Sequence, residues 1–180
     1  MKFSQLSAAL LFAPAMAGLL SKRGVQEVPN PEVDSSVPDA ARAKFLSDDV
    51  KNLLFTKDAE ARDSKGGGPI PQYLYVLQCR EQGFRGDCLV FGAAPGQCVN
   101  YYDFNTDGKT GKAYDKNVTS LSSSYGGVCQ FYNDKDCGFS NDNSGVTLSY
   151  AYNLDIQADK NTRPNDYDGS YGHNISSWRC

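Results

Sequence analysis

The chain has 180 residues, with 18 lysines and arginines against 21 aspartates and glutamates and a formal net charge of -3. Its basic residues form no cluster longer than two, and nucleic-acid binding needs a basic face, so we exclude nucleic acid as a partner. Eleven tyrosines, nine phenylalanines and seventeen glycines favour strands and turns over helices. The length predicts one domain with appendages.

Residues 1–17 have the layout of a secretory signal peptide. Lys2 is followed by the apolar stretch 8–13 and by the small-residue triplet Ala15-Met16-Ala17. A membrane-spanning helix needs about 20 apolar residues, which is longer than this stretch or any later one. We therefore predict a secreted, extracellular protein without a membrane span, cleaved after Ala17.

A second processing signal follows at Lys22-Arg23, the only adjacent basic pair in the chain. It resembles a kexin-type dibasic site, which would make residues 18–23 a pro-segment and begin the mature protein at Gly24. The alternative is a chance pair in a flexible segment. A signal peptide followed by such a pair is fungal in style.

Residues 24–70 are predicted to be a flexible linker with one amphipathic helix. Prolines near residues 28–31 favour extended backbone. Ser47 resembles a helix N-cap, and one face of the helix after it would carry Val50, Leu53 and Leu54. Glycines at 66–68 predict a hinge. This segment is either a pro-segment or docking helix, or a short helix lying on the domain that follows.

The six cysteines all lie in the second part of the chain, at Cys79, Cys88, Cys98, Cys129, Cys137 and Cys180. An even number in an exported chain predicts three disulfides, although the sequence does not choose between the connectivities. There is no C-x-x-C pair and only one histidine, His173, so crosslinks are favoured over a zinc site.

From about residue 71 onward the pattern is that of β-structure. Residues 146–152 alternate larger apolar with small side chains, and residues 73–77 are apolar nearly throughout. Glycine-rich turn signals separate these stretches. Several short strands at this spacing predict a sandwich or a barrel.

An internal repeat sharpens this prediction. Residues 75–88 and 128–137 each combine a strand with a tight polar turn. Residues 117–121 and 174–178 each read Asn, a β-branched apolar residue, Ser or Thr, Ser, and a large apolar residue. The domain is therefore predicted to be built from two similar halves.

This arrangement resembles the βγ-crystallin family. Gln82-Gly83-Phe84-Arg85-Gly86 is similar to the folded hairpin of that family, and Ser120 and Ser177 are similar to its two capping serines. Cys137 stands where the second hairpin would have its aromatic residue. The resemblance implies a mainly β, two-motif Greek-key sandwich over residues 71–180, preceded by a short helical or disordered segment.

The same resemblance implies a calcium site. Calcium-binding members carry the segment [ND]-[ND]-x-x-[ST]-S in each motif, and oxygen ligands suit this cation. The candidate ligands are Asp115, Asn117, Thr119, Asn174 and Ser176. Lys116 breaks the first segment, and Gly172-His173 breaks the second, so weak binding is expected and no cofactor is required. Residues 103–108 also resemble the opening of an EF-hand loop, but Tyr114 replaces its final glutamate, which favours a polar turn.

Two N-glycosylation sequons begin at Asn117 and Asn174, at equivalent positions of the repeat. We predict that at least one of these asparagines is glycosylated, and attached glycans would crowd an ion at these positions. The alternative is that the fold buries both asparagines and leaves them unmodified.

The sequence predicts no catalytic residues. Nucleophilic triads need a histidine base, and His173 lies within the closing segment of the second half. We therefore expect a non-catalytic interaction protein, such as a host-directed effector, a toxin-like protein or an antimicrobial factor, that binds an extracellular protein or glycan. The alternatives are a small hydrolase with an unmarked carboxylate pair and a structural component of a cell wall.

Overall fold

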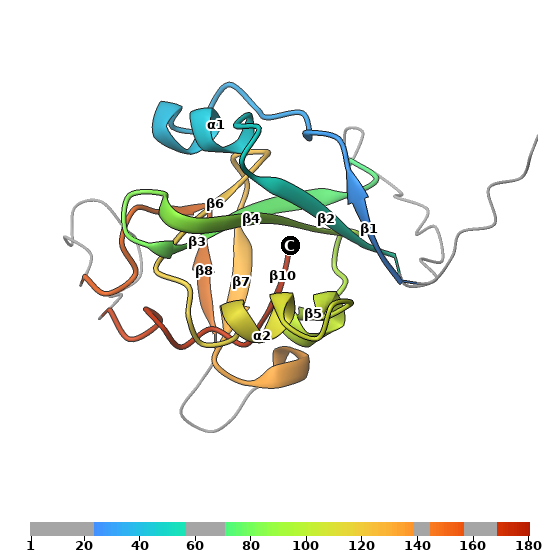
Figure 1. The fold of residues 1–180 in the computed structure, drawn as a ribbon. Coiled ribbons are helices and arrows are strands. Elements are labelled where there is room, and N and C mark those ends of the chain that lie inside the picture. The colour runs from blue at the N-terminus through green and yellow to red at the C-terminus, as the bar shows by residue number, and fades with distance from the viewer. Residues whose placement is uncertain (1–23, 57–70, 139–144, 157–168) are drawn as a thin grey trace, which may run out of the picture.

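The computed structural model describes residues 24–56, 71–138, 145–156 and 169–180. These residues form a mainly β structure with two facing sheets, as Figure 1 shows. The prediction of a mainly β protein is therefore confirmed. The predicted signal peptide, residues 18–23 and the glycine hinge lie outside the described residues.

The first sheet has six strands. Their order across the sheet is β1(Gly24–Val28), β2(Lys51–Thr56), β4(Arg85–Ala93), β3(Leu74–Glu81), β6(Ser120–Ser123) and β9(Tyr150–Ala151). Neighbouring strands are antiparallel except β2 and β4, which are parallel. The second sheet has the order β5(Val99–Asn100), β10(Ser177–Arg179), β7(Cys129–Tyr132) and β8(Val146–Leu148), all antiparallel.

The two halves of the predicted repeat exchange a strand. β3, β4 and β6 come from the first half, but β5 of that half pairs with β10 in the second sheet. In the same way β9, from the second half, pairs with β6 in the first sheet. Each sheet therefore contains strands from both halves. Separating the two halves would break strand pairs in both sheets.

The main core lies between the sheets. Its largest fully buried side chains are aromatic: Phe91, Tyr101, Phe104, Tyr114, Phe131 and Trp178. The Phe91 ring meets the Phe104 and Tyr114 rings at centroid distances of 4.9 and 5.2 Å, both edge to face. Such pairs add about 1 kcal/mol to the stabilisation from buried area. Many of the aromatic residues counted in the sequence therefore form this core.

Three short helices complete the described fold. η1(Tyr101–Phe104) and α2(Thr110–Tyr114) connect β5 to β6, and η2(Lys135–Cys137) follows β7. All three lie along the lower side of the molecule in Figure 1. None of the helices among the described residues has the length and apolar character needed to cross a membrane.

The N-terminal segment differs from its prediction. The expected linker over residues 24–56 instead provides β1, β2 and α1(Asp39–Phe45), and the helix expected after Ser47 is wrong because β2 occupies residues 51–56. β2 buries Asn52 and Leu54, the alternation of a strand, and Asn52 Nδ2 donates a hydrogen bond to Asn30 Oδ1 at 2.8 Å. Pairing with β1 and β4 therefore outweighs the local helical pattern.

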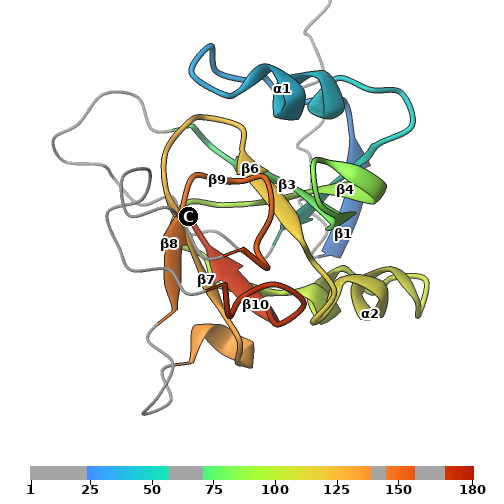
Figure 2. The same ribbon diagram turned by 90° about the vertical axis from the view of Figure 1, so that its left-hand side faces the viewer.

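The position of α1 follows from the side chains of the first sheet. On its outer face Leu77 and Val90 are paired neighbours, whereas the corresponding pair in the second sheet is Gln130 and Thr147. Only the first pair needs cover from water, and Phe45 of α1 packs into the same buried cluster. Figures 1 and 2 show α1 lying across this face.

Candidate functional site: the junction of the two closing segments

The two predicted hairpins are both folded back on themselves. Gly83 and Phe84 have φ angles of 69° and 56°, and Asp136 and Cys137 have φ angles of 58° and 50°. Two successive residues in this region cost free energy when they carry side chains. Tertiary contacts must therefore hold each hairpin in place.

Ser120 and Ser177 provide those contacts. Ser120 Oγ accepts a hydrogen bond from the Phe84 N–H at 3.2 Å and donates one to the Glu81 carbonyl at 2.7 Å. Ser177 Oγ accepts from the Cys137 N–H at 3.0 Å and donates to the Asp134 carbonyl at 2.6 Å. Ser120 and Ser177 are buried, as are Phe84 and Cys137, so each hydroxyl group satisfies a buried N–H donor in addition to one carbonyl acceptor.

The two hairpins are anchored by different chemistry. The Phe84 ring packs on Tyr150 of β9 and on Tyr152 just after that strand, at centroid distances of 5.5 and 6.2 Å. Cys137 instead forms a disulfide with Cys98, next to β5. An aromatic contact in one half is therefore replaced by a covalent bond in the other.

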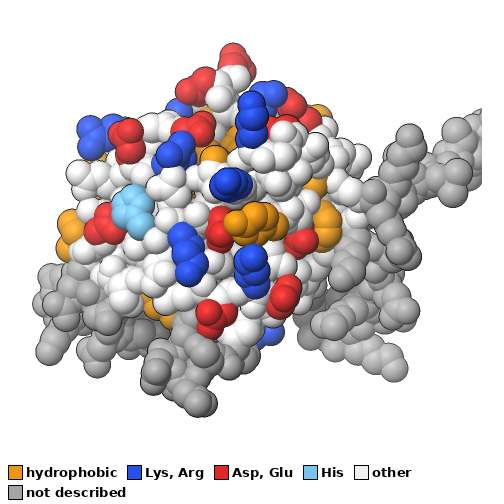
Figure 3. All heavy atoms as spheres, turned by 60° about the horizontal axis from the view of Figure 1, so that its bottom comes forward, with side chains coloured by type: hydrophobic (Ala, Val, Ile, Leu, Met, Phe, Trp, Pro, Cys, Tyr) orange, Lys and Arg blue, Asp and Glu red, His pale blue; other side chains and the backbone are white. Residues whose placement is uncertain are grey.

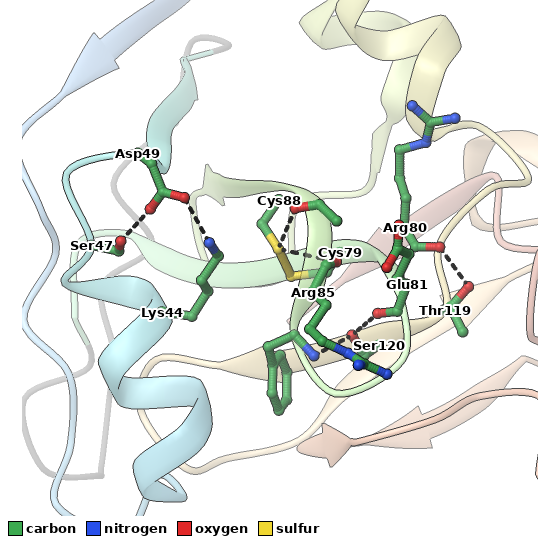
Figure 4. The surroundings of a disulfide bond; sticks show 12 residues. Lys44, Ser47, Asp49, Cys79, Arg80, Glu81, Arg85, Cys88, Thr119 and Ser120 are labelled. Atoms are coloured by element: carbon green, nitrogen blue, oxygen red, sulfur yellow. Dashed lines mark hydrogen bonds and ion pairs between the residues drawn. A yellow bond between two sulfur atoms is a disulfide. The ribbon is translucent and has the colours of Figure 1, made fainter.

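All six cysteines are paired, which confirms the predicted number of disulfides. The bonds are Cys79–Cys88, Cys98–Cys137 and Cys129–Cys180. The first closes the β3–β4 hairpin, and Figure 4 shows the Arg80 and Glu81 carbonyls beyond it, bonded to Thr119 and Ser120. The second joins the two halves.

The two closing segments lie side by side and bond reciprocally. The Lys116 N–H donates to the Ile175 carbonyl at 2.8 Å, and the His173 N–H donates to the Val118 carbonyl at 3.0 Å. Lys116 and His173 have nearly equal φ angles of 56° and 53°. The repeated positions of the sequence therefore meet across the junction of the two halves.

Two of the candidate calcium ligands face His173. Thr119 Oγ1 lies 3.1 Å from His173 Nε2 and donates to the Arg80 carbonyl at 2.9 Å. Asn117 Oδ1 lies 3.4 Å from His173 Nδ1. The structure thus brings Asn117 and Thr119 together around the imidazole of the other half.

The remaining candidate ligands have separate partners. Asp115 follows α2, where its negative charge raises the pKa of the Tyr102 phenol. Asn174 donates to the Ser170 carbonyl at 3.4 Å, and Ser176 is a buried residue whose N–H donates to the Tyr132 carbonyl. No group of three or more His, Cys, Asp or Glu side chains placed to hold a metal occurs among the described residues. Calcium binding at these five residues stays a prediction.

The two sequon asparagines are in equivalent surroundings. Asn117 Nδ2 donates to the Ala113 carbonyl at 3.0 Å, four residues earlier, as Asn174 Nδ2 does to Ser170. Both side chains are half-buried. Their glycosylation also stays a prediction.

The segment that resembles an EF-hand loop forms a capped turn. Asp107 accepts hydrogen bonds from the Lys109 and Thr110 N–H groups and from the Thr110 hydroxyl, at 2.6 to 2.8 Å. Asp103 accepts one from the Asn100 N–H at 2.8 Å. These carboxylates serve the backbone of their own turn, in agreement with the polar-turn interpretation.

Sequence reasoning missed Asp155 as a neighbour of this junction. Its Oδ2 lies 3.7 Å from His173 Nε2. Asp155 belongs to no motif and follows β9, so only the strand exchange brings it here. The presence of a single histidine was the one sequence signal that could have drawn attention to this place.

A further exposed feature is the pair Tyr102 and Lys135. The Lys135 ammonium lies 4.4 Å from the centre of the Tyr102 ring, and 42% of Tyr102 is exposed. Figure 3 shows the face that carries η1, α2 and η2, where apolar side chains stand among charged side chains of both signs.

Comparison of the chain with protein-family models, curated proteins and solved structures gives no match.

Proposed function

We propose that this chain is a secreted, non-catalytic interaction protein whose domain is a two-motif Greek-key sandwich of the βγ-crystallin type. The observation that carries the fold proposal is the pair of equivalent serine contacts, Ser120 in the first hairpin and Ser177 in the second. The exchange of β5 and β9 between the sheets supports it further.

The disulfides support secretion. All six cysteines are bonded, and such bonds persist in oxidising compartments outside the cytosol. They tie the two hairpins and the C-terminus to the sheets, so the described hairpins are held in fixed positions. Rigid loops bind a partner with less loss of conformational entropy than mobile loops do.

The roles of the polar side chains at the junction support binding in place of catalysis. Ser120 and Ser177 use their hydroxyl groups to hold the hairpins, so these groups are not offered to a substrate. The hydroxyl group next to His173 is that of Thr119 and not that of Ser120 or Ser177, so His173 is not paired with either serine as a base. The protein then acts as an effector, a toxin-like protein or an antimicrobial factor by contact with an extracellular protein or glycan.

Tyr102 and Lys135 are the residues that we assign to the contact surface. Tyrosine combines a large apolar ring with a polar tip and dominates the energy of many interfaces. The neighbouring lysine adds a positive charge that a carboxylate or sulfate of the partner would meet.

The test is to apply the secreted, oxidised protein to an array of glycans and microbial cell walls, and to assay growth of microbes and necrosis of host tissue. We expect binding without release of soluble sugars, and loss of that binding in Tyr102→Ala. Leu46→Ala is the matched control, because Leu46 is 51% exposed and follows α1 on the opposite side of the molecule. Release of reducing sugars would identify a hydrolase, and recovery only in wall extracts would identify a structural component.

A further inference from the structure

We infer that His173, Asp155 and Thr119 form a site for a transition-metal ion of borderline softness, such as Zn²⁺, at the junction of the two closing segments. His173 Nε2 lies 3.1 Å from Thr119 Oγ1 and 3.7 Å from Asp155 Oδ2. Ligands bound tetrahedrally at about 2.1 Å stand about 3.4 Å apart, so the separation of each oxygen from Nε2 is close to that of two ligands of one ion. This inference does not depend on the proposed function.

The first step concerns the proton on the imidazole ring. The Asn117 amide is oriented by the hydrogen bond from its Nδ2 to the Ala113 carbonyl, which leaves Oδ1 facing His173 Nδ1 at 3.4 Å. An oxygen at this position accepts an N–H, so the contact stabilises the tautomer that carries its proton on Nδ1 and leaves Nε2 able to bind a metal. Histidines that bind metals have such a partner on the nitrogen that does not bind.

The second step concerns the atoms that face Nε2. The Thr119 hydroxyl gives its hydrogen to the Arg80 carbonyl at 2.9 Å, so it presents lone pairs toward the ring. The carboxylate of Asp155 presents only lone pairs as well. With the ring proton on Nδ1, Nε2 presents a lone pair toward both of these oxygens, and a cation placed between Nε2 and the oxygens removes the repulsion.

The third step concerns how Asp155 is placed. A Cβ atom at Gly172 would lie 1.8 Å from Asp155 Oδ1, so the carboxylate occupies the space that any other residue at position 172 would fill. The Asp155 N–H also donates to Asn153 Oδ1 at 2.9 Å, which fixes the backbone of the turn. Gly172 is thus a positioning residue for the site.

The donor set decides between cations. Calcium takes 6 to 8 oxygen ligands, roughly, whereas imidazole nitrogen suits zinc, copper and nickel. The His173 and Asp155 side chains are 51% and 45% exposed, so an ion can enter and water can complete its coordination. We therefore expect zinc in preference to calcium at this junction.

The single histidine allows a direct experiment. The ¹⁵N-labelled, secreted and oxidised protein is titrated separately with ZnCl₂ and CaCl₂ while the ring nitrogens of His173 are followed by NMR. We expect zinc to shift Nε2 strongly while Nδ1 keeps its proton, and calcium to leave both signals in place. His173→Asn and Asp155→Asn should each weaken zinc binding by about ten-fold or more.

Gly172→Ala should weaken zinc binding without removing a ligand, because the added Cβ displaces the Asp155 carboxylate. Asp136→Asn is the control and should leave zinc binding unchanged, because Asp136 lies away from the junction and accepts a hydrogen bond from Asn100. Thermal unfolding without metal checks that each variant is folded. The inference is overturned if calcium binds more tightly than zinc or if His173→Asn binds zinc as the parent does. It is also overturned if both ring nitrogens of His173 carry protons and neither NMR signal changes when zinc is added.

Discussion

The N–H of Cys137 donates a hydrogen bond to Ser177 Oγ at 3.0 Å, just as the N–H of Phe84 donates one to Ser120 Oγ at 3.2 Å in the other half. In both halves the serine begins the strand that lies next to the hairpin's own strand. The hairpin conformation therefore depends on contacts with a strand that is distant in sequence.

Replacing either serine by alanine should destabilise the protein. Ser120→Ala leaves the buried Phe84 N–H without its partner, and leaving a buried polar group unpaired costs about 1–3 kcal/mol. Ser122→Ala is the control, because Ser122 is buried in the same strand but donates only to the adjacent Ser123 carbonyl, at 3.3 Å. Urea unfolding measures both, and equal losses would contradict the capping role of Ser120.

The N-terminal segment should behave as part of the domain. Phe45 is fully buried in the cluster with Leu77 and Val90, so Phe45→Ala should cost about 3–5 kcal/mol. Its neighbour Leu46 is 51% exposed, and Leu46→Ala should change the free energy of unfolding by about 0.5 kcal/mol or less. Similar values for both variants would mean that α1 is not docked.

The sequence predicted those parts of the fold that are marked by repetition. The equivalence of Ser120 and Ser177 follows from the repeated segment, and the structure places both against hairpins. The helix after Ser47 was wrong because Val50 and Leu54 fit a helical period and a strand period equally well. In the structure Asn52, between them, is buried as the alternation of a strand requires. The sequence does not indicate this burial, because asparagine is polar.

The candidate site was predictable only in part. Asn117 and Thr119 were found because they belong to a motif, and the structure places both side chains against the His173 ring. Asp155 carries no motif and reaches His173 only because β9 lies in the first sheet. Contacts created by strand exchange depend on topology, which single residues do not indicate.

The Cys98–Cys137 disulfide should contribute more to stability than Cys79–Cys88. The first closes a separation of 39 residues and the second only 9, and the loop-entropy model gives about 4 and about 2.5 kcal/mol. Paired cysteine-to-alanine variants compared by urea unfolding under oxidising conditions test this order. A larger loss from the Cys79–Cys88 pair would show that hairpin packing, and not loop closure, sets the contribution.

Asp107 should make stability depend on pH in acid. Hydrogen bonds from the Thr110 hydroxyl, and then from the Thr110 and Lys109 N–H groups, lower the pKa of Asp107 to about 2. An unfolded aspartate has a pKa of about 3.9, so this contribution is complete above that pH and is lost as the pH falls toward 2. The free energy of unfolding, followed from pH 5 to pH 2, should therefore fall less steeply in Asp107→Asn than in the parent. Thr110→Val, which removes the largest cause, should fall between the two, and a slope equal to the parent's in Asp107→Asn would contradict the cap.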